Sequence, residues 1–402
     1  MKSLVLLSLA ACALFAGGYK IPESSLNSVA LSAAGVAHSE GADAAYYNPA
    51  NMVFMKNEHT LEANLFYIGL SDVEYKSAST TINAKREDFI VPSLHYVSQD
   101  IKGMRFGLSV VSPAGLSKRW SDAPAVYSAE EFTLKTVELN PSVAFKINEK
   151  TGVALGVRAI YSEGVVKSTS PIASRDMDGD SLDFGYNLAL SYKPVSELEL
   201  ALTYRSNVDL SVKGDALLSY TGTLGGSVPL GTYTSSSSAS VSVLVPALFN
   251  AAIAYTFATK TTLEFVYERN FWSEYKELDF NYGSSVSPVT NVVFGTPIAK
   301  NWKDTDVFRF GVTQRLDALT LMGGVVIDES PVPEKTLGFE LPDSDSVSVS
   351  LGARYRIDEK LSVGLAALYS IRDERKVTNS SINGEFSNAN VLIVASALEY
   401  RF

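Results

Sequence analysis

The sequence predicts an all-β protein, a transmembrane antiparallel β-barrel of about fourteen strands with an N-terminal hatch inside its lumen. Three observations support this fold class. The chain begins with an export signal, its main part alternates apolar and polar residues, and its connections alternate between short and long. Alternating segments of about a dozen residues are long enough to cross a membrane as tilted strands.

The N-terminus has the organisation of a secretory signal peptide. A positively charged start precedes an apolar stretch from Leu4 to about Phe15, and small residues follow. Cleavage after Ala16 fits the pattern as well as cleavage after Gly18. We therefore assign residues 1–18 to the signal peptide, leave the cleavage site open between residues 16 and 18, and expect the mature chain to start at about residue 17 to 19.

The chain contains one cysteine, Cys12, which lies within the predicted signal peptide. The preceding residues also resemble a lipoprotein cleavage box, but its apolar core would be very short and the residues after Cys12 are apolar. Once Cys12 is removed, disulfides cannot hold the fold together. The fold must therefore be held by its own hydrogen bonds, and a closed β-sheet satisfies all of its backbone hydrogen bonds internally.

Composition excludes several other classes of protein. With 46% hydrophobic and 10% aromatic residues the chain has ample surface to bury, which argues against disorder. A net charge of −10 argues against a nucleic-acid binder. After the signal no apolar run approaches the roughly 18 residues of a membrane helix.

Residues 19–57 do not alternate and are rich in small and polar side chains. Asn48 precedes Pro49, which favours a turn at that point. We expect this segment to enter the lumen as a hatch and residues 58–402 to form the barrel.

The barrel region consists of segments with period-two alternation. Val347, Val349 and Leu351 share one face of such a segment, whereas Ser346 and Ser348 share the other. The predicted strands lie near 58–71, 87–99, 103–113, 131–147, 151–167, 181–193, 196–212, 241–257, 261–280, 304–316, 318–330, 346–357, 360–376 and 389–402.

The predicted connections also alternate in length. Short turns near 148–150 and 358–359 are interleaved with long loops, which are expected near 168–180, 213–240, 281–303 and 331–345. Short periplasmic turns and long external loops are typical of outer-membrane barrels, so both termini are expected in the periplasm.

Two of these predicted loops have distinctive compositions. The stretch 213–240 is serine-rich and is interpreted as a surface loop, with a binding role as the alternative. Residues 176–180 carry alternating carboxylates like the start of a calcium loop, but the glutamate that would complete the site is missing. An acidic external loop is the preferred interpretation.

The last strand ends with Phe402 on its apolar face, together with Leu398 and Tyr400. A terminal outward aromatic looks like the signal that the outer-membrane assembly machinery reads. We therefore expect that machinery and outer-membrane lipid as partners, and the outer membrane of a Gram-negative cell as the location.

No motif for catalysis, a cofactor or a metal is found. The three histidines, His38, His59 and His95, are scattered without the close spacing of a metal site. Inward-facing charges such as Arg158 and Arg309 are expected to pair across strands. The protein is predicted not to be an enzyme. The chain lacks the Ser/His constellation that an outer-membrane lipid hydrolase would need. A structural or adhesive barrel would have no reason to carry a plug of about forty residues.

Several sequence blocks resemble the FadL family of outer-membrane transporters for long-chain fatty acids and other hydrophobic compounds. The N-terminal blocks are Gly18 to Ser25, Gly41 to Ala45 and Asn48-Pro49-Ala50. The later blocks are Ser112 to Leu116, Leu139 to Val143, Asn301-Trp302-Lys303-Asp304, Asp328 to Pro333 and Leu341-Pro342-Asp343. They span nearly the whole chain after the signal.

The resemblance implies a fourteen-stranded barrel with a hatch and a kinked third strand that opens a lateral gap in the wall. Substrate would pass sideways into the membrane by passive diffusion. The implied hatch residues are Tyr19, Ile21, Asn48, Pro49 and Ala50. The candidates for the kink are Gly103, Gly107, Pro113 and Gly115.

The chain departs from the family at two positions, with Tyr19 where phenylalanine is usual and Ser346 where arginine is frequent. Both departures leave the substrate open between a long-chain fatty acid and an aromatic hydrocarbon. A carboxylate head group needs a charged partner. The candidates for that role are Lys167, Lys300 and Lys303.

Overall fold

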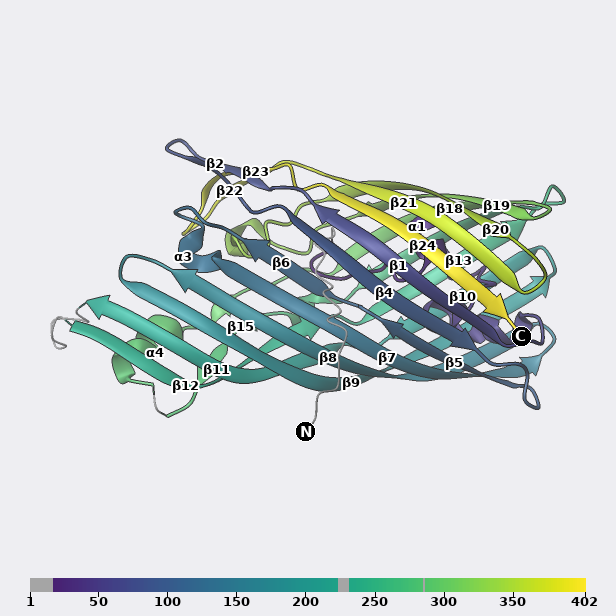
Figure 1. Cartoon of the computed structure of the whole chain (residues 1–402), viewed down its shortest axis with the longest axis horizontal. Helices are drawn as coiled ribbons and strands as arrows, with labels where there is room; N and C mark the ends of the chain where they lie inside the picture. The colour runs from purple at the N-terminus through teal and green to yellow at the C-terminus, as the bar shows by residue number, and fades with distance from the viewer. Residues whose placement is uncertain (1–16, 223–230, 285) are drawn as a thin grey trace.

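The chain forms a closed antiparallel β-barrel in a computed structural model that describes residues 17–222, 231–284 and 286–402 (Figure 1). The first wall strand, β1 (Thr60–Leu70), pairs with the last, β24 (Val391–Arg401), along its whole length. The sheet therefore closes on itself. The predicted all-β class and number of wall strands, fourteen, are confirmed.

Three of the fourteen wall strands are interrupted and consist of two consecutive segments. These pairs are β5 with β6, β10 with β11, and β12 with β13. Between β1 and β24 the wall contains β4 (Glu87–Val97), β5 (Met104–Val111), β6 (Gly115–Arg119), β7 (Glu131–Asn148), β8 (Thr151–Thr169), β9 (Ala173–Val195), β10 (Leu198–Arg205), β11 (Val208–Gly222), β12 (Gly231–Val245), β13 (Leu248–Thr256), β14 (Thr261–Asn270), β18 (Thr305–Leu316), β19 (Leu319–Asp328), β20 (Ser346–Arg356) and β21 (Leu361–Arg372).

The period-two alternation gives the wall an apolar outer face and a polar inner face. On β20, Val347, Val349 and Leu351 are exposed, whereas Ser346 and Ser348 are buried. A wall with an apolar outside and a polar inside is the pattern of a membrane barrel. No helix among the described residues is long and apolar enough to cross a membrane.

The predictions of two long loops, at 168–180 and 213–240, are wrong. Strand β9 begins at Ala173, so residues 173–180 of the predicted 168–180 loop, including the acidic motif, are part of the wall. Strands β11 and β12 pair from Val208↔Val245 to Gly222↔Gly231 and form a long hairpin instead of the 213–240 loop. The tip, residues 223–230, lies outside the described residues. A ladder needs only backbone groups, so small hydroxyl side chains do not prevent it.

Two other predicted strands end earlier than expected. Strand β14 ends at Asn270 rather than near residue 280, and β21 ends at Arg372 rather than near residue 376. Short elements follow these two strands and also β1, β6 and β19, and they cover the end of the barrel that carries the long connections. These elements are β2 (Glu74–Lys76), β3 (Thr81–Asn83), α3 (Val126–Ala129), η2 (Trp272–Glu274), β15 (Glu277–Leu278), β16 (Phe280–Tyr282), α4 (Pro288–Phe294), β17 (Ile298–Ala299), η3 (Glu334–Thr336), β22 (Arg375–Thr378) and β23 (Asn383–Ser387).

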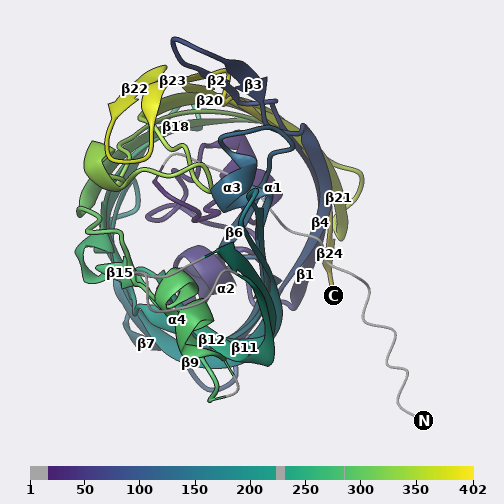
Figure 2. The same ribbon diagram turned by 90° about the vertical axis from the view of Figure 1, so that its left-hand side faces the viewer.

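The N-terminal segment lies inside the ring of strands, where Figure 2 shows α1 (Leu26–Ala30) and α2 (Ala44–Tyr47). A capping box between Ser25 and Ser28 starts α1, which packs against β20, β21 and β24. The wall makes room for it at Gly352, where a Cβ would lie 2.4 Å from the Cβ of Ala30. The third element, η1 (Pro49–Phe54), packs against β7, β8 and β9 at the short-turn end.

We expect the folded barrel to resist detergent, because its wall satisfies its backbone hydrogen bonds internally. Unboiled and boiled samples should therefore migrate differently on a denaturing gel. Identical migration, together with release of the chain as a soluble periplasmic species, would contradict the barrel.

Candidate functional site

The wall ladder is interrupted at its third strand. Strand β5 ends at Val111 and β6 begins at Gly115, and between them Pro113 has no N–H to donate. Strand β4 pairs with β5 only over Leu94–Val97, and β6 pairs with β7. The remainder of β4 therefore faces a gap in the ladder on the side of β6.

The N-terminal segment supplies hydrogen-bond partners at this break. The amide of Ile21 donates to the carbonyl oxygen of Pro113 at 2.9 Å, and the amide of Gly115 donates to the carbonyl oxygen of Tyr19 at 2.9 Å. Lys20 and Ala114 form an antiparallel bridge between these bonds. The start of the segment thus acts as a short added strand at the point where the wall opens.

The four kink candidates occupy three different environments. Pro113 lies in the break and Gly115 begins β6. Gly103 is in a left-handed conformation in the turn before β5. A Cβ on Gly107 would lie 2.8 Å from the Cβ of Ala45, so glycine allows the N-terminal segment to approach the wall there.

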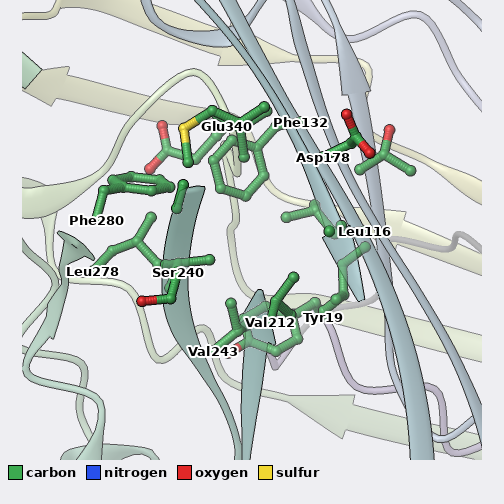
Figure 3. A pocket seen from close by; sticks show the side chains of 18 of the residues that line it. Tyr19, Leu116, Phe132, Asp178, Val212, Ser240, Val243, Leu278, Phe280 and Glu340 are labelled. Carbon is green, nitrogen blue, oxygen red and sulfur yellow. The ribbon is translucent and has the colours of Figure 1, made fainter. Parts of the chain in front are cut away.

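An apolar cavity of about 760 Å³, part of it open to solvent, lies next to the break (Figure 3). Most of its lining is aliphatic or aromatic, from β6, β7, β8, β9, β11 and β12 and from the covering elements. Representative lining residues are Tyr19, Leu116, Phe132, Val212, Val243 and Phe280.

Tyr19 forms the boundary between the cavity and the N-terminal segment. Its hydroxyl donates to the carbonyl oxygen of Leu244 at 2.5 Å, and its ring meets Trp272 edge-on at a centroid distance of 5.1 Å. Burial raises the pKa of Tyr19 well above its ordinary value, so the hydroxyl stays protonated and can donate. Trp302 packs on the same ring at 5.6 Å.

Buried ion pairs fix the segment to the wall. The ammonium group of Lys20 pairs with Glu268 and donates to Asn270 at 2.9 Å. Arg309 lies 3.4 Å from Glu268 and donates to the carbonyl oxygen of Ser32 at 2.9 Å. These inward charges connect wall strands to the segment inside.

Other inward charges follow two patterns. Arg158 pairs across strands with Glu138 at 3.0 Å, as predicted. Glu264 instead accepts backbone N–H groups of the N-terminal segment, from Val36 at 2.7 Å and Ala37 at 2.6 Å. Inward charge therefore also serves to hold the segment.

Asn48 links the turn at Pro49 to the wall. Its side-chain amide donates to the carbonyl oxygen of Val36 at 2.7 Å and to the hydroxyl of Ser191 on β9 at 2.9 Å. Its side-chain oxygen accepts the amide of Ala50 at 3.1 Å, which caps η1. Removing this side chain would release two contacts within the segment and one to β9.

The three head-group candidates lie in different places. Lys300 is buried and lines the cavity, where its ammonium pairs with Glu340 at 2.5 Å. Lys303 is exposed, and Lys167 pairs with Asp176 at 3.2 Å at a partly exposed site. Of the three, the structure brings only Lys300 to the cavity.

Glu340 was not identified from the sequence. Burial acts to raise its pKa, but the ammonium group of Lys300 and its hydrogen bond act more strongly, so the pKa of Glu340 lies below its ordinary value. It belongs to a loop forty positions from Lys300, and no local pattern predicts that contact. A further cation, Arg175, lies over the ring of Phe280 at 4.5 Å.

Among the described residues, no group of three or more His, Cys, Asp or Glu side chains could hold a metal ion. The arrangement suits binding of an apolar molecule with at most a small polar group. It contains a closed ion pair at one end and Tyr19 at the boundary with the N-terminal segment.

Comparison with known proteins gives consistent matches over nearly the whole chain. Residues 7–402 match the family model described as outer membrane protein transport protein (OMPP1/FadL/TodX). The chain is 26% identical over 379 residues to a long-chain fatty acid transport protein of Escherichia coli O6:H1, covering 82% of this chain and 81% of that protein. It is 22% identical over 363 residues to outer membrane protein P1 of Haemophilus influenzae, covering 78% and 75%.

Solved structures share the fold. A Pseudomonas aeruginosa FadL homologue superposes with a TM-score of 0.83 at 19% identity, covering 96% of this chain and 99% of that one. The Ralstonia pickettii toluene transporter TbuX superposes with a TM-score of 0.73 at 17% identity, covering 94% and 98%. At these identities the likeness establishes the fold.

With cleavage after Ala16, which keeps Gly18 in the mature chain, we predict that Gly18→Ala displaces Tyr19 from the cavity. A Cβ on Gly18 would lie 2.8 Å from the rings of Trp272 and Trp302, and φ is +82°, which costs a non-glycine residue about 1–2 kcal/mol. Tryptophan emission should shift to longer wavelength as the two indoles meet water. Gly35→Ala is the matched control, because its Cβ would meet only Leu31, at 3.7 Å. Equal spectra for the two variants would contradict this packing.

Proposed function

We propose that this outer-membrane barrel takes up long-chain fatty acids or related hydrophobic compounds by passive diffusion. The premise is that the chain belongs to the outer-membrane transport protein family (OMPP1/FadL/TodX). The observation that carries the proposal is the apolar cavity next to the break in the third wall strand. The cavity offers a binding site, and the break offers an exit toward the membrane.

In the proposed route, ligand enters at the long-loop end, binds beside Tyr19 and leaves sideways between β4 and β6. Residues 19–57 act as the hatch that closes the lumen. This route is supported by the position of Tyr19, which lines the cavity while its carbonyl oxygen accepts a hydrogen bond from the amide of Gly115 at the break. A displacement of this short segment would act on the cavity and on the break together.

The energetics favour an elongated apolar ligand. Burial of a hydrocarbon tail contributes up to about 0.8 kcal/mol per methylene, from which ordering costs are subtracted. A tail can therefore supply most of the affinity, and the head group sets the specificity. We propose Lys300 for the head group, with Glu340 as the internal carboxylate that competes for it.

An aromatic hydrocarbon is the second candidate ligand. The specific observation in its favour is the number of rings around the cavity, which include Tyr19, Phe132, Tyr275, Phe280 and Trp302. A ring-lined site with a closed ion pair suits a ligand that has no head group.

The remaining assignments are also proposals. Residues 1–18 would be the signal peptide, of which 1–16 lie outside the described residues, and residues 58–402 would be the barrel. Phe402, which stacks on His59 at a centroid distance of 5.1 Å, would be read by the assembly machinery during insertion into outer-membrane lipid. Both termini would lie in the periplasm.

Glu340→Gln is expected to raise the affinity for a long-chain fatty acid by about ten- to a hundred-fold, because it frees Lys300 for a charge-assisted bond worth about 1.5–3 kcal/mol. Affinity for the methyl ester of the same acid should not change. Calorimetric titration of purified barrel with the acid and the ester measures both.

Glu374→Gln removes an exposed loop carboxylate and is the control for net charge. Equal gains for acid and ester would remove Lys300 from head-group recognition. Tighter binding of toluene than of either compound would favour the aromatic alternative.

Asn48→Ala together with Pro49→Ala is expected to leave barrel assembly intact but to alter uptake of hydrophobic substrate. The reason is that Asn48 fixes the hatch through hydrogen bonds, whereas the wall is held by its own ladder. Uptake of a labelled fatty acid and the gel shift of unboiled protein should be measured side by side.

Asn207→Ala, at an exposed position of the wall, is the matched control for these hatch variants. Loss of the gel shift in the hatch variants would make the turn a folding element. Unchanged uptake would remove it from the mechanism.

A further inference from the structure

A row of small residues crosses the wall of the apolar cavity. Gly164 on β8 pairs with Gly179 on β9, and Gly179 pairs with Gly214 on β11. Gly214 in turn pairs with Ala239 on β12, and all four residues line the cavity. Neighbouring strands lie about 4.8 Å apart, so the row extends about 14 Å around the barrel.

Larger side chains delimit this row at both ends and along half of each side. At one end Gly164 pairs with Leu134, and at the other Ala239 pairs with Tyr282. Along the strands, Val166 pairs with Met177 on one side of the row, and Val212 pairs with Val241 on the other. These last two pairs line the same cavity, so the small residues form the floor of a furrow whose sides are bulky and apolar over half of their length. The other halves of the two sides are small, with Ala216 paired to Ser237 and Ser162 paired to Ser181.

Two of the three glycines are required by the backbone. A Cβ on Gly214 would lie 1.9 Å from the carbonyl oxygen of Asp178, and a Cβ on Gly179 would lie 2.7 Å from the backbone of Lys213. These contacts explain glycine at both positions through the close approach of β9 and β11.

Close approach of the backbone does not explain the glycine at position 164. Its Cβ would meet only Val212, at 3.6 Å, and the carbonyl oxygen of Thr133, at 3.9 Å, both ordinary contacts. Its φ is not in the left-handed region. The wall would therefore accept a side chain at this position, and such a side chain would occupy the furrow.

We propose that the furrow holds the tail of an elongated hydrocarbon ligand and that Gly164 determines the longest tail that the cavity accepts. This inference rests on the proposed uptake of hydrophobic compounds and specifies the ligand as a chain rather than a compact ring. A side chain at position 164 blocks the floor between Leu134 and Gly179. Tail atoms that no longer fit lose their burial, while a ligand too short to reach this point loses nothing.

The test compares octanoic and hexadecanoic acid on the wild-type protein and on Gly164→Ala and Gly164→Leu. Binding is measured by calorimetric titration of the full-length folded barrel. Gly164→Leu should weaken binding of hexadecanoic acid at least about tenfold, the effect of losing burial of roughly two methylenes. Binding of octanoic acid should be unchanged, and Gly164→Ala should fall between.

Val165→Leu, at the adjacent position on the opposite face of β8, is the matched control and should bind both acids as the wild type does. The gel shift of unboiled protein verifies folding of each variant, and Gly164→Ala keeps the test valid should leucine prevent assembly.

Equal effects on the two acids, or no effect on either, would overturn the role of Gly164 while leaving uptake intact. Failure of the wild-type protein to bind either acid would instead overturn the proposed function itself, and the furrow with it.

Discussion

A wall in a lipid bilayer can be interrupted only where another group satisfies the backbone it releases, because an unpaired N–H or C=O costs several kcal/mol there. In this barrel the third strand is interrupted between Val111 and Gly115, and Tyr19 to Ile21 provide partners from inside. The interrupted strand and the N-terminal segment are therefore one structural unit.

The other features of the interior follow from this arrangement. A short segment without a core of its own must be held by the wall, and buried charges such as Lys20 with Glu268 hold it. Glu264 accepts three consecutive backbone amides of the segment, from Val36 to His38. The same segment carries Tyr19 into the apolar cavity, so a residue that completes the wall also lines the proposed binding site.

The sequence was sufficient for the number of wall strands and the closure of the sheet, because a lipid-facing outside and a polar inside impose a period of two. It was insufficient where that pattern weakens. The serine-rich 213–240 stretch forms the β11–β12 hairpin around a tip outside the described residues, since a backbone ladder tolerates small hydroxyl side chains. The carboxylates within residues 173–180 likewise predict a solvent-exposed loop, but these residues form the start of strand β9.

Within the site, local sequence identified single residues but not their partners. Lys300 was a head-group candidate, yet its pairing with Glu340 depends on how two loops fold over the barrel. The glycine row required knowledge of register across β8, β9, β11 and β12, which no single strand contains. Of the four kink candidates only Pro113 and Gly115 lie at the break, because glycine also serves turns and close packing.

The most direct test of this account is hydrogen exchange at the backbone amides of Ile21 and Gly115 in the folded barrel. Both donate across the break, at 2.9 Å, so the account predicts that both exchange as slowly as amides within β5 and β7. Fast exchange at both, with β5 and β7 still protected, would contradict the central claim that the N-terminal segment completes the wall.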